Sequence, residues 1–150
     1  YMPLALLIGV VLIMQMGLVL GSWVTAEQAM SLRAAPTSLM VVMEPVILMR
    51  ILTNLVANAV KHTTRGQILI GGRRVGSEIS VEVYDTGNGI GPAQLKEVFE
   101  PYQAGVDSLG EGLGLAVVRD LAEANGVSIS VKSQLGRGSR FTISGLPRHE

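Results

Sequence analysis

The stretch from Pro45 to His62, PVILMRILTNLVANAVKH, decides the fold class of this chain. Glu44 precedes it, and an acidic residue before a first-turn proline is typical of a helix start, because the acid suits the positive end of the helix dipole. At 3.6 residues per turn, the apolar residues of one helix face are Leu48, Leu52, Leu55, Val56 and Ala59. We therefore predict an amphipathic helix over residues 45–62 that covers a hydrophobic core.

The opposite face of this helix is polar. By the same period, its residues lie within about 80° of one another: Arg50, Asn54, Asn58 and Lys61. An amide oxygen can coordinate a hard cation such as Mg²⁺, and a lysine can meet a phosphate. A helix face that is simply turned to solvent could carry the same side chains, so the pattern alone leaves both interpretations open.

Segments with strand-like alternation surround the helix and predict a sheet. A short apolar strand precedes the helix, a hairpin follows it, and a second helix leads into another pair of strands. These elements are predicted over residues 38–43, 67–73, 78–84, 113–124, 127–133 and 139–146, with the first hairpin turn at 76–77. Helices and an antiparallel-leaning sheet in this order indicate a single domain, an α+β two-layer sandwich.

The strand predicted over residues 78–84 directs a carboxylate toward the core. Ile79, Val81 and Val83 face inward, and Asp85 is the next residue in phase. An unpaired buried charge is unfavourable, so we expect Asp85 to have a dedicated donor in the protein or in a ligand. The run TGNGIG at 86–91 could approach a ligand closely, because glycine lacks a Cβ, although an aspartate-capped turn would use the same residues.

Residues 86–112 are rich in glycine, proline and polar side chains, and we predict at most one short helix there, over 92–99. Long loops in compact domains are usually functional or disordered. This one ends in GEGLGL at 110–115, which enters the helix predicted over 113–124. A helix N-terminus attracts anions such as phosphate, but this glycine pattern is weak evidence, since it is neither the Rossmann pattern nor a P-loop.

Five segments resemble, in order and spacing, the N, G1, F, G2 and G3 boxes of the histidine-kinase catalytic and ATP-binding domain. That domain belongs to the superfamily shared with DNA gyrase B, Hsp90 and MutL. The segments are residues 54–62, 85–90, 99–102, 110–115 and 136–141. The resemblance covers residues 37–146 and implies a Bergerat-type fold, in which a mixed, mostly antiparallel sheet packs on about three helices and residues 86–112 form an ATP lid.

On the adenine side, the resemblance implies that Asp85 accepts a hydrogen bond from the amino group of the base. Gly87 and Gly89 would let the chain pass the base, and Ser139 would place a hydroxyl near Asp85 and adenine. The resemblance also implies that His62 and Ile90 contact the bound nucleotide.

On the phosphate side, the resemblance implies that Asn58 holds Mg²⁺ against the phosphates of ATP. Asn54 and Lys61 would act beside it in the transfer reaction, and Phe99 would anchor one end of the lid. The other end of the lid would be formed by Gly110, Gly112, Leu113 and Gly114.

The resemblance also bears on the reaction. ATP-hydrolysing relatives carry a water-positioning glutamate at the position of Asn54, so we expect transfer of the γ-phosphoryl group to a protein side chain instead. In histidine kinases the acceptor is a histidine on a separate helical hairpin, and a response regulator then receives the phosphoryl group. We interpret His62 as a residue that packs on the adenosine side or as a helix-end group, rather than as an acceptor. We expect this chain to bind ATP without phosphorylating itself.

Two alternatives belong to other functional classes. One is a regulatory, non-catalytic domain that binds nucleotide, and the other is a Ser/Thr protein kinase of the anti-sigma type, which shares these boxes. Many family members carry arginine or lysine in the F box or lid, whereas residues 99–112 contain neither. This departure favours the regulatory alternative.

The composition excludes several classes of function. With 12 basic and 12 acidic residues the net charge is zero, which leaves no basic face for nucleic acid. The absence of cysteine excludes disulfide scaffolds and cysteine chemistry. The 48% of hydrophobic residues fits a chain with one substantial core.

All charged residues lie from Glu27 onward, and residues 2–20 are apolar apart from Gln15. Such a run could cross a bilayer, although no lysine or arginine flanks it before Arg33. The resemblance implies instead that residues 4–20 and 31–35 are the first helix and the following strand. An unusually apolar outer face would then contact a partner, either the phosphoacceptor hairpin or a second copy of this chain. Because the chain starts at Tyr1, we expect it to be a piece of a longer protein. We expect this piece to lie in the cytoplasm, and the parent protein can be membrane-associated.

Overall fold

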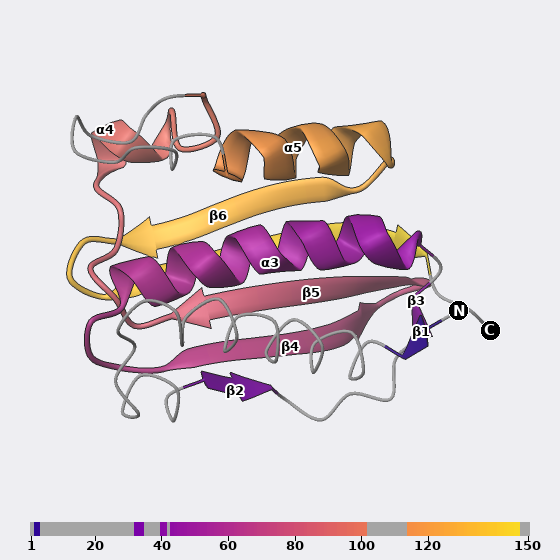
Figure 1. Cartoon of the computed structure of the whole chain (residues 1–150), viewed down its shortest axis with the longest axis horizontal. Coiled ribbons are helices and arrows are strands. Elements are labelled where there is room, and N and C mark those ends of the chain that lie inside the picture. The colour runs from indigo at the N-terminus through magenta and orange to yellow at the C-terminus, as the bar shows by residue number, and fades with distance from the viewer. Residues whose placement is uncertain (1, 4–31, 35–39, 42, 102–113, 148–150) are drawn as a thin grey trace.

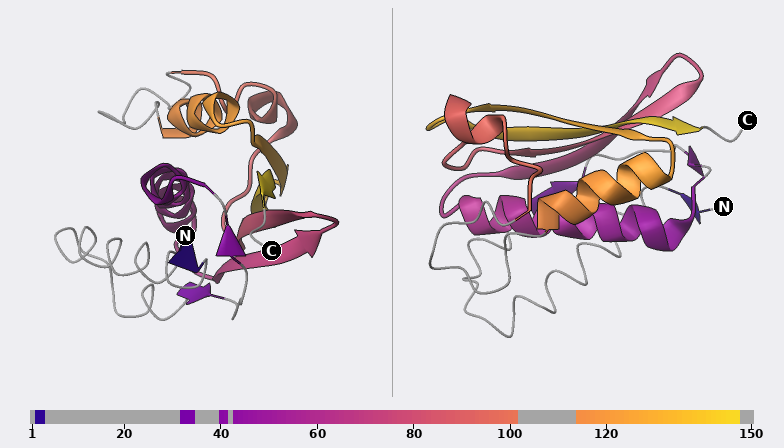
Figure 2. Two further views of the ribbon diagram at one scale, coloured as in Figure 1. Left: turned by 90° about the vertical axis from the view of Figure 1, so that its right-hand side faces the viewer. Right: turned by 90° about the horizontal axis from the view of Figure 1, so that it is seen from above.

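The computed structural model describes residues 2–3, 32–34, 40–41, 43–101 and 114–147. In this part of the chain, five strands form a sheet in the order β2-β4-β5-β7-β6, and helices α3 (Pro45–His62) and α5 (Gly114–Ala124) pack on it. Both helices lie on the same side of the sheet (Figure 1, Figure 2). The prediction of a two-layer α+β sandwich is therefore confirmed.

The sheet is mixed and mostly antiparallel, as expected. Its strands are β2 (Leu32–Ala34), β4 (Ile68–Val75), β5 (Glu78–Asp85), β6 (Ser128–Gln134) and β7 (Gly138–Pro147). β2 runs parallel to β4, and the other neighbours pair antiparallel. A separate antiparallel pair joins β1 (Met2–Pro3) to β3 (Met40–Val41).

The core lies between the helices and the inner face of the sheet. All five residues predicted for the apolar face of α3 are buried, and Ile51 is buried with them. The sheet contributes Ile70, Val81, Val83, Phe141 and Ile143, and α5 contributes Val118 and Ala122. Phe141 is the bulkiest fully buried side chain. Burial of aliphatic and aromatic side chains of this kind contributes about 1.5–3 kcal/mol each, so this layer dominates the stability of the domain.

The helix predicted over 92–99 is shorter in the structure, where α4 covers Pro92–Leu95. Tight turns replace its second half, because the amides of Glu97 and Glu100 bond to carbonyls three residues earlier. The turns let the Phe99 ring pack edge to face on Phe141, with ring centroids 6.3 Å apart. The helix therefore ends before a segment that makes a tertiary contact, and local sequence does not reveal this contact.

At the N-terminus, the strand predicted over 31–35 is present as β2. The helix predicted over 4–20 lies outside the described residues, as does the apolar stretch considered as a membrane span. Among the helices that the structure describes, none is long and apolar enough to span a bilayer.

Candidate nucleotide-binding site

Three segments that are far apart in the sequence meet at one end of the sheet: the end of α3, the loop after β5 and the β6–β7 turn. The carbonyl of His62 accepts a hydrogen bond from the Asn88 amide at 3.0 Å. The Asn88 carbonyl in turn accepts one from the Gly136 amide at 2.7 Å. These bonds join the predicted N, G1 and G3 boxes through backbone atoms, so the three segments are held side by side at this end of the sheet.

Asp85 ends β5 and lies in this junction with only 2% of its surface exposed. Its Oδ1 accepts a hydrogen bond from the Gly87 amide at 2.9 Å. Burial raises the pKa of Asp85 above its ordinary value, while the amides of Gly87 and Ser139, the charge of His62 and the hydroxyl of Thr63 act in the opposite direction. The inward orientation predicted from strand alternation is confirmed, and the carboxyl has a protein donor.

Gly87 and Gly89 are required by contacts within the protein. A Cβ on Gly87 would lie 2.2 Å from the His62 carbonyl oxygen, and a Cβ on Gly89 would lie 2.0 Å from the Gln134 carbonyl oxygen. Gly89 also has φ +68°, which favours glycine. The structure thus gives these residues a role that the sequence did not suggest, and passage of a base along them stays a prediction.

Ser139 is the register partner of Asp85 across the β5–β7 pair. Its hydroxyl lies 2.9 Å from the Ser133 hydroxyl, which also donates to the Gly138 carbonyl and accepts from the Ile90 amide at 2.7 Å. Sequence reasoning missed Ser133, because nothing in its own segment shows that it meets residue 90. The alternation of β6 places Ser133 on the inner face of the sheet. This alternation was the signal in the sequence that could have identified Ser133 as a candidate.

Thr63, the residue after α3, was also missed. Its side chain is buried, and its Oγ1 has no hydrogen-bond partner among the described residues. The hydroxyl lies close enough to the Asp85 carboxyl to lower its pKa. A buried polar atom without a partner is unfavourable, so a ligand that supplied one here would gain free energy.

The polar face of α3 meets the N-terminus of α5. Asn54 and Asn58 are half-buried, whereas Arg50 and Lys61 are exposed. Asn54 donates through Nδ2 to the Arg50 carbonyl at 2.8 Å, and a Cβ on Gly114 would lie 3.3 Å from its Oδ1. The first turn of α5 therefore lies beside an amide side chain of α3. Free amides at a helix N-terminus favour anions, so a phosphate would fit this end of the site.

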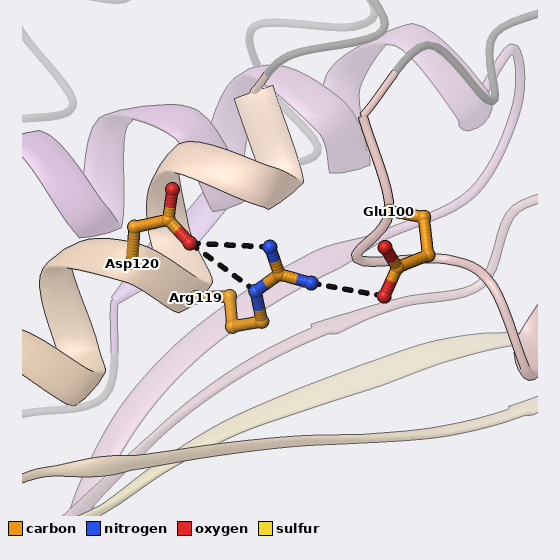
Figure 3. Close-up of polar contacts among 3 residues, drawn as sticks. All are labelled: Glu100, Arg119 and Asp120. Atoms are coloured by element: carbon orange, nitrogen blue, oxygen red, sulfur yellow. Dashed lines mark hydrogen bonds and ion pairs between the residues drawn. The ribbon is translucent and has the colours of Figure 1, made fainter.

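The segment that carries Phe99 is also held to α5 by charge. Arg119 lies between two carboxylates, with Glu100 at 2.9 Å and Asp120 at 3.2 Å (Figure 3). Nothing in the sequence pattern indicated this bridge. The other predicted contacts Gly110, Gly112 and Leu113 lie outside the described residues.

The buried carboxyl, the buried hydroxyl and the adjacent helix N-terminus form one candidate site on the helix side of an α+β sandwich. Residues 43–150 match the family described as histidine kinase-, DNA gyrase B-, and HSP90-like ATPase. The chain belongs to this family, which confirms the family predicted from its five boxes.

Curated proteins that are similar to this chain include a sensor-like histidine kinase and a sensor protein. The chain is 38% identical over 116 residues to the sensor-like histidine kinase SenX3 of Mycobacterium tuberculosis (strain ATCC 25618 / H37Rv), covering 73% of this chain and 28% of SenX3. It is 39% identical over 94 residues to the alginate biosynthesis sensor protein KinB of Pseudomonas aeruginosa, covering 61% of this chain and 16% of KinB. The matched part of the chain thus spans less than a third of the length of each of these relatives.

Solved structures show the same fold. The catalytic domain of histidine kinase ThkA has a TM-score of 0.77 at 23% identity, with 98% of this chain and 93% of that chain covered. Full-length ShkA in complex with AMPPNP has a TM-score of 0.72 at 28% identity, with 95% of this chain and 30% of that chain covered. The fold predicted from the boxes is confirmed by these matches.

Proposed function

We propose that this chain is the ATP-binding catalytic domain of a two-component sensor histidine kinase. In this proposal it binds Mg-ATP and transfers the γ-phosphoryl group to a histidine on a dimerisation hairpin outside the chain, and a response regulator receives the group next. The observation that carries the proposal is the buried Asp85 carboxyl beside the Thr63 hydroxyl, which has no partner in the described part of the chain.

The adenine base would lie at this pair. Asp85 would accept a hydrogen bond from the exocyclic amino group, and Thr63 would gain the partner that its hydroxyl otherwise lacks. Ser139 and Ile90 would form the adjoining wall, since the Ser133 hydroxyl is hydrogen-bonded to both residues. The AMPPNP complex of ShkA supports binding of an adenine nucleotide by this fold, because ShkA shares the fold and was solved with such an analogue.

The phosphates would lie toward the polar face of α3 and the N-terminus of α5. Asn58 would coordinate Mg²⁺ through its amide oxygen, and Lys61 would meet phosphate charge. The residues that the structure describes contain no group of three His, Asp or Glu side chains suited to a metal. A magnesium ion held by Asn58 would therefore take its other ligands from ATP and water, and when bound it would neutralise phosphate charge.

In this proposal, Asn54 is the residue that favours transfer of the γ-phosphoryl group over hydrolysis of ATP. Its Nδ2 is bound to the Arg50 carbonyl, so Oδ1 is the group nearest to Gly114. An amide oxygen accepts a hydrogen bond but does not take up a proton at neutral pH, so it would not activate a water molecule. The residues of the site would then act by positioning ATP and leaving the acceptor histidine to attack.

The proposal is tested by phosphoryl transfer in trans. The chain is mixed with γ-labelled ATP, Mg²⁺ and the histidine hairpin of its parent protein, and the acid lability of the labelled hairpin is measured. Acid-labile, base-stable label is expected, and Asn58→Ala should reduce its formation at least tenfold. Asn125→Ala serves as the control, because Asn125 is an exposed asparagine just after α5, outside the candidate site.

Two other outcomes would identify the alternatives. ATP binding without any transfer would support the regulatory domain, which is favoured by the lack of arginine and lysine at residues 99–112. Acid-stable phosphoserine would support a Ser/Thr kinase of the anti-sigma type. We further propose that the domain works in the cytoplasm, where ATP is available, and that its apolar N-terminal segment contacts the hairpin or a second copy.

A further inference from the structure

A hollow of about 290 Å³ lies on the outer face of the sheet, opposite α3 and α5. Its lining comes from all four antiparallel strands and includes Arg73, Ser80, Glu82, Lys132, Arg140 and Thr142. Among the described elements, the helices lie on the other side of the sheet (Figure 2). This hollow is therefore separate from the candidate nucleotide site, whose Asp85 side chain is buried on the helix side.

A β-bulge forms the hollow. Ile79 pairs with Leu146 and Val81 pairs with Ile143, so β7 uses one more residue than β5 between these pairs. The extra residue is accommodated at Gly145, which has φ +80° and lines the hollow. Bulges bend the strand and disrupt the ladder locally, and they occur often beside functional sites.

Ser80 lies on β5 between these two pairs and lines the hollow. Its side chain is only 3% exposed, and its Oγ has no hydrogen-bond partner in the described part of the chain. A buried hydroxyl without a partner is rare and calls for an explanation, such as a ligand or an ordered water molecule.

The charges around the hollow are the observation that points to a ligand, because Ser80 lies at the bulge, four residues along β5 from Tyr84, the cross-strand partner of Arg140. Lys132 and Arg140 are direct cross-strand partners, and like charges in that position are unfavourable. Within the described residues, neither forms an ion pair with a carboxylate, and Arg140 lies over the Tyr84 ring at 5.7 Å. Glu82 is paired with Arg73 at 3.4 Å instead. Two neighbouring positive charges therefore lack a counter-charge at one end of the hollow.

We propose that this hollow binds a small oxyanion of the phosphate-monoester class, between Lys132 and Arg140. A phosphate monoester carries nearly two negative charges at neutral pH, which matches two adjacent cations better than a single carboxylate does. The hydroxyls of Thr142 and Ser130 lie in the next cross-strand pair along the same face and can donate to its oxygens. The carboxylate of Glu82 restricts the anion to the Lys132 end.

The test is an NMR titration of the isotopically labelled chain with inorganic phosphate, with acetate as a carboxylate comparison. With phosphate, saturable chemical-shift changes are expected at the amides of residues 130–132 and 140–142. Acetate should bind more weakly than phosphate. The combined Lys132→Gln and Arg140→Gln substitutions should weaken binding at least tenfold, whereas Glu82→Gln should strengthen it. Lys96→Gln, an exposed cation beside α4, should leave it unchanged. Glycerol 3-phosphate and a phosphoserine peptide then distinguish a free metabolite from a modified protein as the source.

The proposal is contradicted if these amides do not shift, if acetate acts as strongly as phosphate, or if the double variant responds like the wild-type chain. The dispersion of each variant's spectrum reports whether it folds. Phosphate bound at the candidate nucleotide site would shift residues 114–116 instead, and would persist in the double variant. A chain that failed to bind ATP could therefore still bind phosphate in the hollow, and a chain without phosphate binding in the hollow could still bind ATP.

Discussion

Asp85 and Ser139 are directly paired across β5 and β7, at the point where the G1 and G3 loops leave the sheet. The pair places a buried carboxyl beside a hydroxyl that is already bonded to Ser133. The sheet register therefore builds one wall of the candidate site, and the end of α3, the loop after β5 and the β6–β7 turn meet beside it.

Gly87→Ala should destabilise the domain by about 1–3 kcal/mol, because the new Cβ would overlap the His62 carbonyl and the backbone would have to shift. Urea unfolding measures the effect. Gly91→Ala is the control: Gly91 has φ −71° and only the end of the Gln94 side chain within reach, so a change within about 0.5 kcal/mol is expected. Equal stability of the Gly87 variant and the wild type would show that the two loops do not pack as described.

Ser133→Ala should cost about 1–3 kcal/mol of stability, since it leaves the Ile90 amide without its acceptor and removes the bond to the Gly138 carbonyl. Ser128→Ala, at an exposed position on the same strand, is expected to change stability by no more than about 0.5 kcal/mol. Amide hydrogen exchange at Ile90 gives an independent check, because its protection should fall only in the Ser133 variant.

The stability of the domain should depend on the ionisation of Asp85. Burial raises its pKa in the folded state above the ordinary value of 3.8, so the folded protein binds this proton more tightly than the unfolded chain. Stability from this group is then present at acid pH and is lost as the pH rises through the raised pKa. Asp85→Asn, which stays neutral, should therefore stabilise the fold more at pH 7 than at pH 4.

Urea unfolding of both proteins at the two pH values checks this expectation. A stability difference that is the same at pH 4 and pH 7 would show that the Asp85 carboxyl has an ordinary pKa in the folded state.

The bridge from Arg119 to Glu100 should hold the Phe99 segment weakly. Its members are partly or largely exposed, with relative side-chain exposures of 28% and 54%, so solvent and salt screen the pair. A double-mutant cycle with Arg119→Gln and Glu100→Gln should give a small favourable coupling that disappears in 1 M salt. Coupling that persists at high salt would mean that the pair is more enclosed than its exposure indicates.

The main elements of the fold could be predicted because their signals are local. The apolar period of residues 45–62 defines α3, and the alternation that buries Ile79, Val81 and Val83 also directs Asp85 inward. The order of the five boxes then gave the family, which residues 43–150 confirm.

The rest depends on contacts between distant segments. Local pattern favoured a helix to residue 99, but the packing of Phe99 on Phe141 requires turns after Leu95. The roles of Thr63 and Ser133 arise only once the end of α3, the G1 loop and the β6–β7 turn are brought together. The reason for Gly87 is likewise a backbone contact with residue 62, which no local signal contains.

The most direct measurement is the affinity of the chain for Mg-ATP, determined by isothermal titration calorimetry for the wild type, Asp85→Asn and the control Glu123→Gln. Glu123 is an exposed acid on α5, outside the candidate site. Loss of a hydrogen bond to a charged acceptor corresponds to about 1.5–3 kcal/mol, so Asp85→Asn should weaken binding roughly tenfold to a hundredfold, while the control binds like the wild type. No binding to the wild-type chain, or equal binding by the Asp85 variant, would contradict the account.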